Sequence, residues 1–77
     1  MIEYKIDFDG DFPLWQRICH KFWVENGYYV IEEVPGWLRA VDPSLYDIRL
    51  HKLESKHWAT LYFEHESDKT AFLLRWV

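Results

Sequence analysis

The stretch HWATLYFE, residues 57–64, decides the fold that the sequence predicts. Its aromatic and β-branched residues favour a strand, and successive side chains of a strand point to opposite faces of a sheet. One set of alternate positions holds Ala59, Leu61 and Phe63. The other set holds Trp58, Thr60 and Tyr62. We therefore expect a sheet with the first set in the core and the second set on its outer face.

Three further segments favour strands. Residues 2–8 alternate apolar with charged side chains, which predicts one buried face and one wet, acidic face. Residues 28–34 are rich in aromatic and β-branched residues, although their pattern leaves open which face is buried. Residues 42–53 fit a helix capped at Asp42 or a strand, and the alternation from residue 46 to residue 51 favours the strand.

Two segments favour helices. Leu14, Ile18 and Phe22 recur at helical spacing after a capping residue, Asp11, and the Asn26-Gly27 pair supplies a stop. A final short helix would place Phe72 and Trp76 on one face, closing the core. The predicted fold is a single α+β domain over residues 1–77, with one antiparallel sheet and two helices on one face. The order β-α-β-β-β-α makes it a ferredoxin-like variant without the last strand.

Composition restricts the classes of partner. The chain has 77 residues, 19% of them aromatic, and a domain of this size cannot bury so many large rings. Some of these rings should therefore lie at the surface. The net charge of −4, from 9 Lys and Arg against 13 Asp and Glu, argues against nucleic acid as the main ligand. A protein partner is the better expectation.

Cysteine content and hydropathy suggest a cytoplasmic protein. The single cysteine, Cys19, excludes an intrachain disulfide and a cysteine-based zinc cluster. On an apolar helix face it should be a buried thiol rather than a nucleophile. The sequence shows no signal-peptide pattern and no apolar run long enough to span a membrane. We expect no metal and no cofactor.

The acidic stretch DFDGD, residues 7–11, resembles motif I of haloacid-dehalogenase-type phosphotransferases. That resemblance implies a nucleophile at Asp7 and a general acid at Asp9, both beside magnesium. Asp11 stands where the family has threonine, and the family's larger parallel sheet does not fit in this chain. We therefore interpret the stretch as the end of a strand followed by a helix cap. A small metal-dependent nuclease or phosphatase, using Asp7 and Asp9 or pairing His57 with Asp47, is the enzymatic alternative.

The end of the chain, from Trp58 to Val77, resembles small accessory proteins of tailed phages. The features that carry the resemblance are a strand, a helix capped by Ser or Asp, and the sequence Phe-x-Leu-Arg-Trp. The resemblance implies a protein that binds and modulates a host protein. It implies no catalytic residue.

Our functional prediction is a non-enzymatic protein-binding module whose partner is a host enzyme or a second copy of the chain. The expected binding residues are Trp58, Tyr62, Thr60, Glu3 and Asp7. Aromatic anchors within a polar rim are typical of protein interfaces. Single-strand RNA stacking on the two rings is an alternative, although acidic neighbours would repel phosphates. In a further alternative, the connector at Trp37-Leu38 covers the rings and leaves no site.

Overall fold

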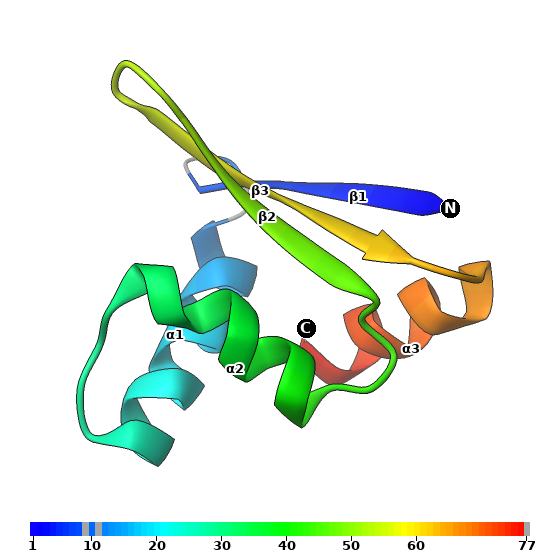
Figure 1. Ribbon diagram of the computed structural model, residues 1–77, viewed down its shortest axis with the longest axis horizontal. Helices are drawn as coiled ribbons and strands as arrows, with labels where there is room; N and C mark the ends of the chain where they lie inside the picture. Colours follow the sequence, from blue (N-terminus) through cyan, green and yellow to red (C-terminus); the bar gives the residue numbers. More distant parts are fainter. Residues whose placement is uncertain (9, 11, 77) are drawn as a thin grey trace.

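A three-stranded antiparallel sheet lies over three helices (Figure 1). The structure, a computed structural model, describes residues 1–8, 10 and 12–76. In chain order the elements are β1 (Ile2–Asp7), α1 (Phe12–Asn26), the 3-10 helix η1 (Ile31–Glu33), α2 (Val34–Val41), β2 (Asp47–Leu53), β3 (Lys56–Phe63) and α3 (Glu66–Trp76). The sheet order is β1-β3-β2, so β3, which carries Trp58 and Tyr62, is the central strand. The prediction of an α+β fold with a single antiparallel sheet is confirmed.

The inner face of the sheet is sealed by the helices. Ala59, Leu61 and Phe63 of β3 are all 0% exposed, as the alternation predicts. Their neighbours across the sheet include Ile6, opposite Ala59, and Ile48, opposite Leu61, and both are buried. Since three strands contribute apolar side chains to one side, the core lies between the sheet and the helices.

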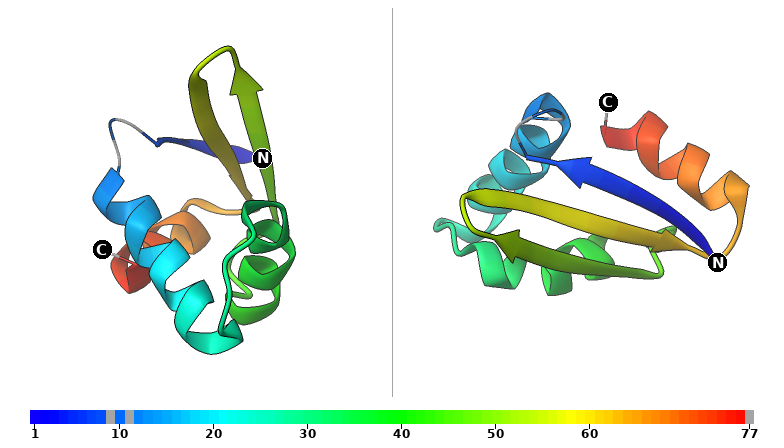
Figure 2. Two further views of the ribbon diagram at one scale, coloured as in Figure 1. Left: turned by 90° about the vertical axis from the view of Figure 1, so that its left-hand side faces the viewer. Right: turned by 90° about the horizontal axis from the view of Figure 1, so that it is seen from above.

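Helices α1 and α3 close the core from below the sheet (Figure 2). Ile18 and Phe22 of α1 are fully buried, one turn apart. The helix stops where the sequence predicts, because Gly27 adopts φ +78° and its N–H donates to the Trp23 carbonyl at 2.8 Å. From α3, the Phe72 ring packs against Phe63 with centroids 5.4 Å apart. The prediction that Phe72 lies in the core is confirmed.

The segment from 28 to 34 is not a strand, and this prediction was wrong. Residues 28–30 form a loop, η1 follows, and Val34 already begins α2. Val34 and Leu38 are spaced by one helical turn and both are fully buried, so burial of a helical stripe overrides the strand preference of the local residues. Pro35 lies in the first turn of α2, where its missing N–H costs nothing.

The predicted order β-α-β-β-β-α is therefore replaced by β-α-α-β-β-α. A loop, η1 and the first residue of α2 take the place of the expected second strand, and α2 brings the α-helices on the inner face to three rather than two. The ferredoxin-like arrangement is not obtained, because it requires a strand in that place. Residues 47–53 do form a strand, as the alternation favours. Within the described chain, no helix is long and apolar enough to cross a membrane.

The buried side chain of Asp42 links the end of α3 to the connection between α2 and β2. Its side chain is 2% exposed and follows directly after α2. One carboxylate oxygen accepts a hydrogen bond from the Trp76 indole N–H at 2.9 Å, and the other accepts from the Ser44 backbone N–H at 3.1 Å. The end of α3 is thereby tied to the connection between α2 and β2. A buried carboxylate needs such partners, because burial without them is costly.

Candidate protein-binding face of the sheet

The outer face of the sheet carries three rows of side chains, one from each strand in every row. The register gives the rows as Glu3–Tyr62–Asp47, Lys5–Thr60–Arg49 and Asp7–Trp58–His51. We call these nine residues the open sheet face. No helix of the described chain lies over it (Figures 1 and 2). The open sheet face is therefore an aromatic strip along β3 between two charged edges.

All five predicted binding residues lie on this face. Glu3 is the register partner of Tyr62, Asp7 is the partner of Trp58, and Thr60 lies between the two rings. The alternative in which Trp37 covers the rings does not hold. Trp37 belongs to α2 and packs edge-on against Phe22, with ring centroids 5.3 Å apart, on the helical side of the sheet. The structure thus brings the five residues together and leaves their face uncovered.

The Trp58 ring is held flat by its neighbours across the sheet. The His51 ring stacks on it with centroids 5.3 Å apart and planes 19° apart. The Lys5 ammonium lies 5.2 Å from the centre of the Trp58 ring, within cation–π range. These contacts leave Trp58 half-buried and restrict its rotamers. A ring that is already ordered loses less conformational entropy on binding.

Sequence reasoning missed the cations of this face. Lys5 shares its strand parity with Glu3 and Asp7, so the alternation already places it beside them. Arg49 and His51 share the outward parity of β2, but their places beside Thr60 and Trp58 follow only from the register of the hairpin. The face therefore carries charges of both signs rather than the purely acidic rim that we expected.

A hollow of about 290 Å³ adjoins Tyr62 at the β2 edge. It is lined by Met1, Tyr46, Asp47, Arg49 and Tyr62. Asp47 is the charged centre of this edge, with Arg49 at 3.6 Å and Arg39 at 3.7 Å. Tyr46, which is 51% exposed, lines the hollow together with Tyr62. An apolar side chain of a partner could enter here beside Tyr62.

The enzymatic alternatives find little support in the placed residues. Asp9 and Asp11 lie outside the described residues, so only Asp7 of the DFDGD stretch is placed, exposed at the end of β1. Asp47 is opposite Tyr62 whereas His57 is opposite Lys52, so this pair sits at the two ends of the hairpin and cannot act together. Among the described residues no three His, Cys, Asp or Glu side chains are grouped as metal ligands.

A second exposed apolar area lies where α1 ends, and the sequence argument missed it by assigning 28–34 to the sheet. We call Trp23, Tyr28, Tyr29 and Val30 the helix-end cluster; its rings are 45–53% exposed. Tyr28 donates a hydrogen bond to Glu33 at 2.8 Å, which raises the pKa of Tyr28. Cys19 is half-buried and donates to the Tyr29 hydroxyl at 3.3 Å. Burial raises the pKa of Cys19, so the thiol stays protonated at neutral pH.

No protein-family model, no curated protein and no solved structure matches the chain. Its function has to be inferred from the arrangement of its own residues.

Proposed function

We propose that the chain is a non-enzymatic protein-binding domain that docks onto another protein through the open sheet face. The observation that carries the proposal is the pair Trp58 and Tyr62 on the central strand, on a side that no helix covers. Aromatic side chains at the centre of a patch commonly supply most of the binding free energy of an interface. The charged residues of β1 and β2 on either side of the strip would form the polar rim.

The neighbours of the rings favour protein over RNA. Three carboxylates, those of Glu3, Asp7 and Asp47, flank the strip and would repel a phosphate backbone. The Trp58 ring already has His51 stacked on it, whereas an RNA-binding sheet offers free ring faces to bases. Protein interfaces instead combine aromatic anchors with a rim of mixed charge.

A different protein is a better partner than a second copy. Two sheets packed face to face about a two-fold axis through Thr60 would place the Lys5–Arg49 row against itself. Like charges in direct opposition disfavour that arrangement. The resemblance of Trp58–Val77 to phage accessory proteins points to a host protein, which the chain would bind and modulate in the host cytoplasm.

The experiment compares two double variants in capture from a bacterial lysate. Trp58→Ala with Tyr62→Ala removes the strip, whereas Trp23→Ala with Leu74→Ala removes two apolar side chains on helices, 53% and 77% exposed. We expect the tagged wild type and the helix variant to retain the same stoichiometric protein, and the strip variant to lose it. With the purified partner, the strip variant should bind at least about a hundredfold more weakly, since each decade corresponds to about 1.4 kcal/mol.

A third variant examines the rim. Glu3→Lys should mainly slow association and change its salt dependence. Charges at the rim of an interface affect the association rate more than the stability of the docked complex. Loss of the partner in the helix variant, with normal binding by the strip variant, would place the interface at the helices and refute the proposal. Wild type that sediments as a dimer, with a monomeric strip variant, would make the partner a second copy.

A further inference from the structure

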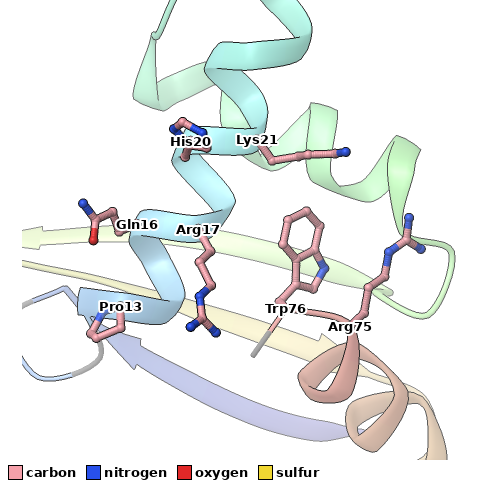
Figure 3. A pocket seen from close by; sticks show the side chains of 7 residues that line it. All are labelled: Pro13, Gln16, Arg17, His20, Lys21, Arg75 and Trp76. Carbon is pink, nitrogen blue, oxygen red and sulfur yellow. The ribbon is translucent and has the colours of Figure 1, made fainter.

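A groove of about 480 Å³ lies between α1 and α3, on the helical side of the molecule (Figure 3). It is lined by Pro13, Gln16, Arg17, His20, Lys21, Arg75 and Trp76. Three of these residues are permanent cations and none is acidic, in a chain whose net charge is −4. Positive charge is thus concentrated where two helices meet.

The cations come from two elements and surround one ring. Arg17 and Lys21 are one turn apart on α1, so they project from the same side of that helix. Arg75 reaches the groove from the last turn of α3. Figure 3 shows the three side chains around the Trp76 indole, while Gln16 and His20 extend toward the other side of α1. The indole thus lies among three cationic side chains.

Among the residues that the structure describes, these cations have little counter-charge. Of the ion pairs between described residues, none includes Arg17 or Arg75. Lys21 lies 3.5 Å from Glu25, but both side chains are exposed, and such pairs contribute little. Arg75 also complements the dipole of α3 at its C-terminal end, a role that does not account for the two cations in the middle of α1.

The base of the groove is fixed. Trp76 is 7% exposed and its indole N–H is held by Asp42 at 2.9 Å. The Asp42 carboxylate is buried, and its oxygens accept hydrogen bonds from Trp76 and Ser44. A rigid base reduces the entropy that a ligand must offset on binding.

We propose that this groove binds the phosphate group of a small phosphorylated molecule. Guanidinium groups match the oxygens of a phosphate in pairs, and Lys21 adds a mobile point charge. The volume is within the range of small-molecule sites, and Pro13 with the edge of Trp76 offers apolar contact for the organic part. The site is separate from the open sheet face, so it stands or falls independently of the protein partner.

The test is a titration followed by NMR, with AMP, its phosphate-free counterpart adenosine, and pyrophosphate as probes. AMP and pyrophosphate should shift the indole N–H signal of Trp76 and the Nε–H signals of Arg17 and Arg75, and the shifts should saturate. Adenosine should shift none of them. Arg17→Gln and Arg75→Gln should each weaken binding at least about tenfold, whereas Lys52→Gln, the same charge change on the distant hairpin, should leave it unchanged.

Three results would overturn the proposal. The first is the lack of a saturable shift with AMP or pyrophosphate at concentrations up to about 10 mM. That concentration would nearly saturate a site with a dissociation constant of about 1 mM. The second is an equal loss of binding in Lys52→Gln, which would mean that only net charge matters. The third is the same shifts with sodium sulfate at matched ionic strength, which would show an adventitious ion only.

Discussion

The two faces of β3 differ although they share one backbone. On the inner face Ala59, Leu61 and Phe63 are completely buried in a core to which the helices contribute. On the open sheet face Trp58 and Tyr62 remain half-buried, and Trp58 is contacted by His51 and Lys5 of the neighbouring strands. One set of alternate residues in β3 therefore stabilises the core, and the other set is available for binding. Substitutions at successive positions should separate these two roles.

The largest effect is expected on the inner face. Phe63→Ala should lower the free energy of unfolding by about 3–5 kcal/mol, because it removes a fully buried ring that packs on Phe72. That is a large share of the stability of a small domain, so the variant should be mostly unfolded. Thermal melting followed by circular dichroism measures it, with Phe63→Leu as the milder control. A melting temperature equal to that of the wild type would mean that this face is not the core.

Asp42 gives the next largest effect, because it anchors the helices of the inner face. Asp42→Ala should cost about 1–3 kcal/mol, since the buried Trp76 indole N–H loses its acceptor. Asp42→Asn keeps an acceptor oxygen and should cost less. Denaturant unfolding of Asp42→Ala, Trp76→Phe and the double variant measures the coupling between the two side chains. Strictly additive losses would show that the hydrogen bond does not stabilise the fold.

The contrast between the faces was predictable from sequence because a strand has a period of two. The alternation in residues 57–64 correctly separated the buried side chains from those on the outer face, and the pattern of residues 2–8 placed Glu3 and Asp7 on the same side as Trp58. Local alternation carries this information without knowledge of the rest of the fold. The five predicted positions of the site follow from it.

Other parts of the molecule depend on contacts that a local pattern does not contain. At 28–34, β-branched and aromatic residues favour a strand, but Val34 instead begins a helix that packs Val34 and Leu38 into the core. The groove escapes prediction because Arg75 joins Arg17 and Lys21 only when α3 packs beside α1. The cations of β2 on the open sheet face likewise require the hairpin register.

A smaller loss of stability is expected on the open sheet face. Trp58→Ala with Tyr62→Ala should lower the free energy of unfolding by about 1 kcal/mol, because each cross-strand pair on an exposed face contributes roughly 0.2–1 kcal/mol. The largest single loss should be the contact of Trp58 with His51 and Lys5. Denaturant unfolding of this variant beside Phe63→Ala gives the comparison directly. If the double variant unfolds as readily as Phe63→Ala, the two faces are equivalent and the open face is part of the core.

The smallest effect concerns pH and the helix-end cluster, which belongs to neither face of the sheet. Burial is the main cause that raises the pKa of Tyr29, and its hydrogen bond with Cys19 adds to it; burial also raises the pKa of Cys19. Because the folded state favours the protonated forms, their contribution is fully present below the ordinary pKa values, about 8.5 for Cys and about 10 for Tyr. This contribution to stability is lost as the pH rises above the ordinary pKa values toward the raised pKa values of the folded state.

The melting temperature should therefore be level between pH 6 and 8, roughly the range below both ordinary values, and should fall at higher pH. Tyr29→Phe removes the hydroxyl that loses its proton, so its melting temperature should fall less steeply than that of the wild type over the alkaline range. All other ionisable groups are common to both proteins, so the difference between the two curves is the signal of Tyr29. Parallel curves would show that folding does not raise the pKa of Tyr29.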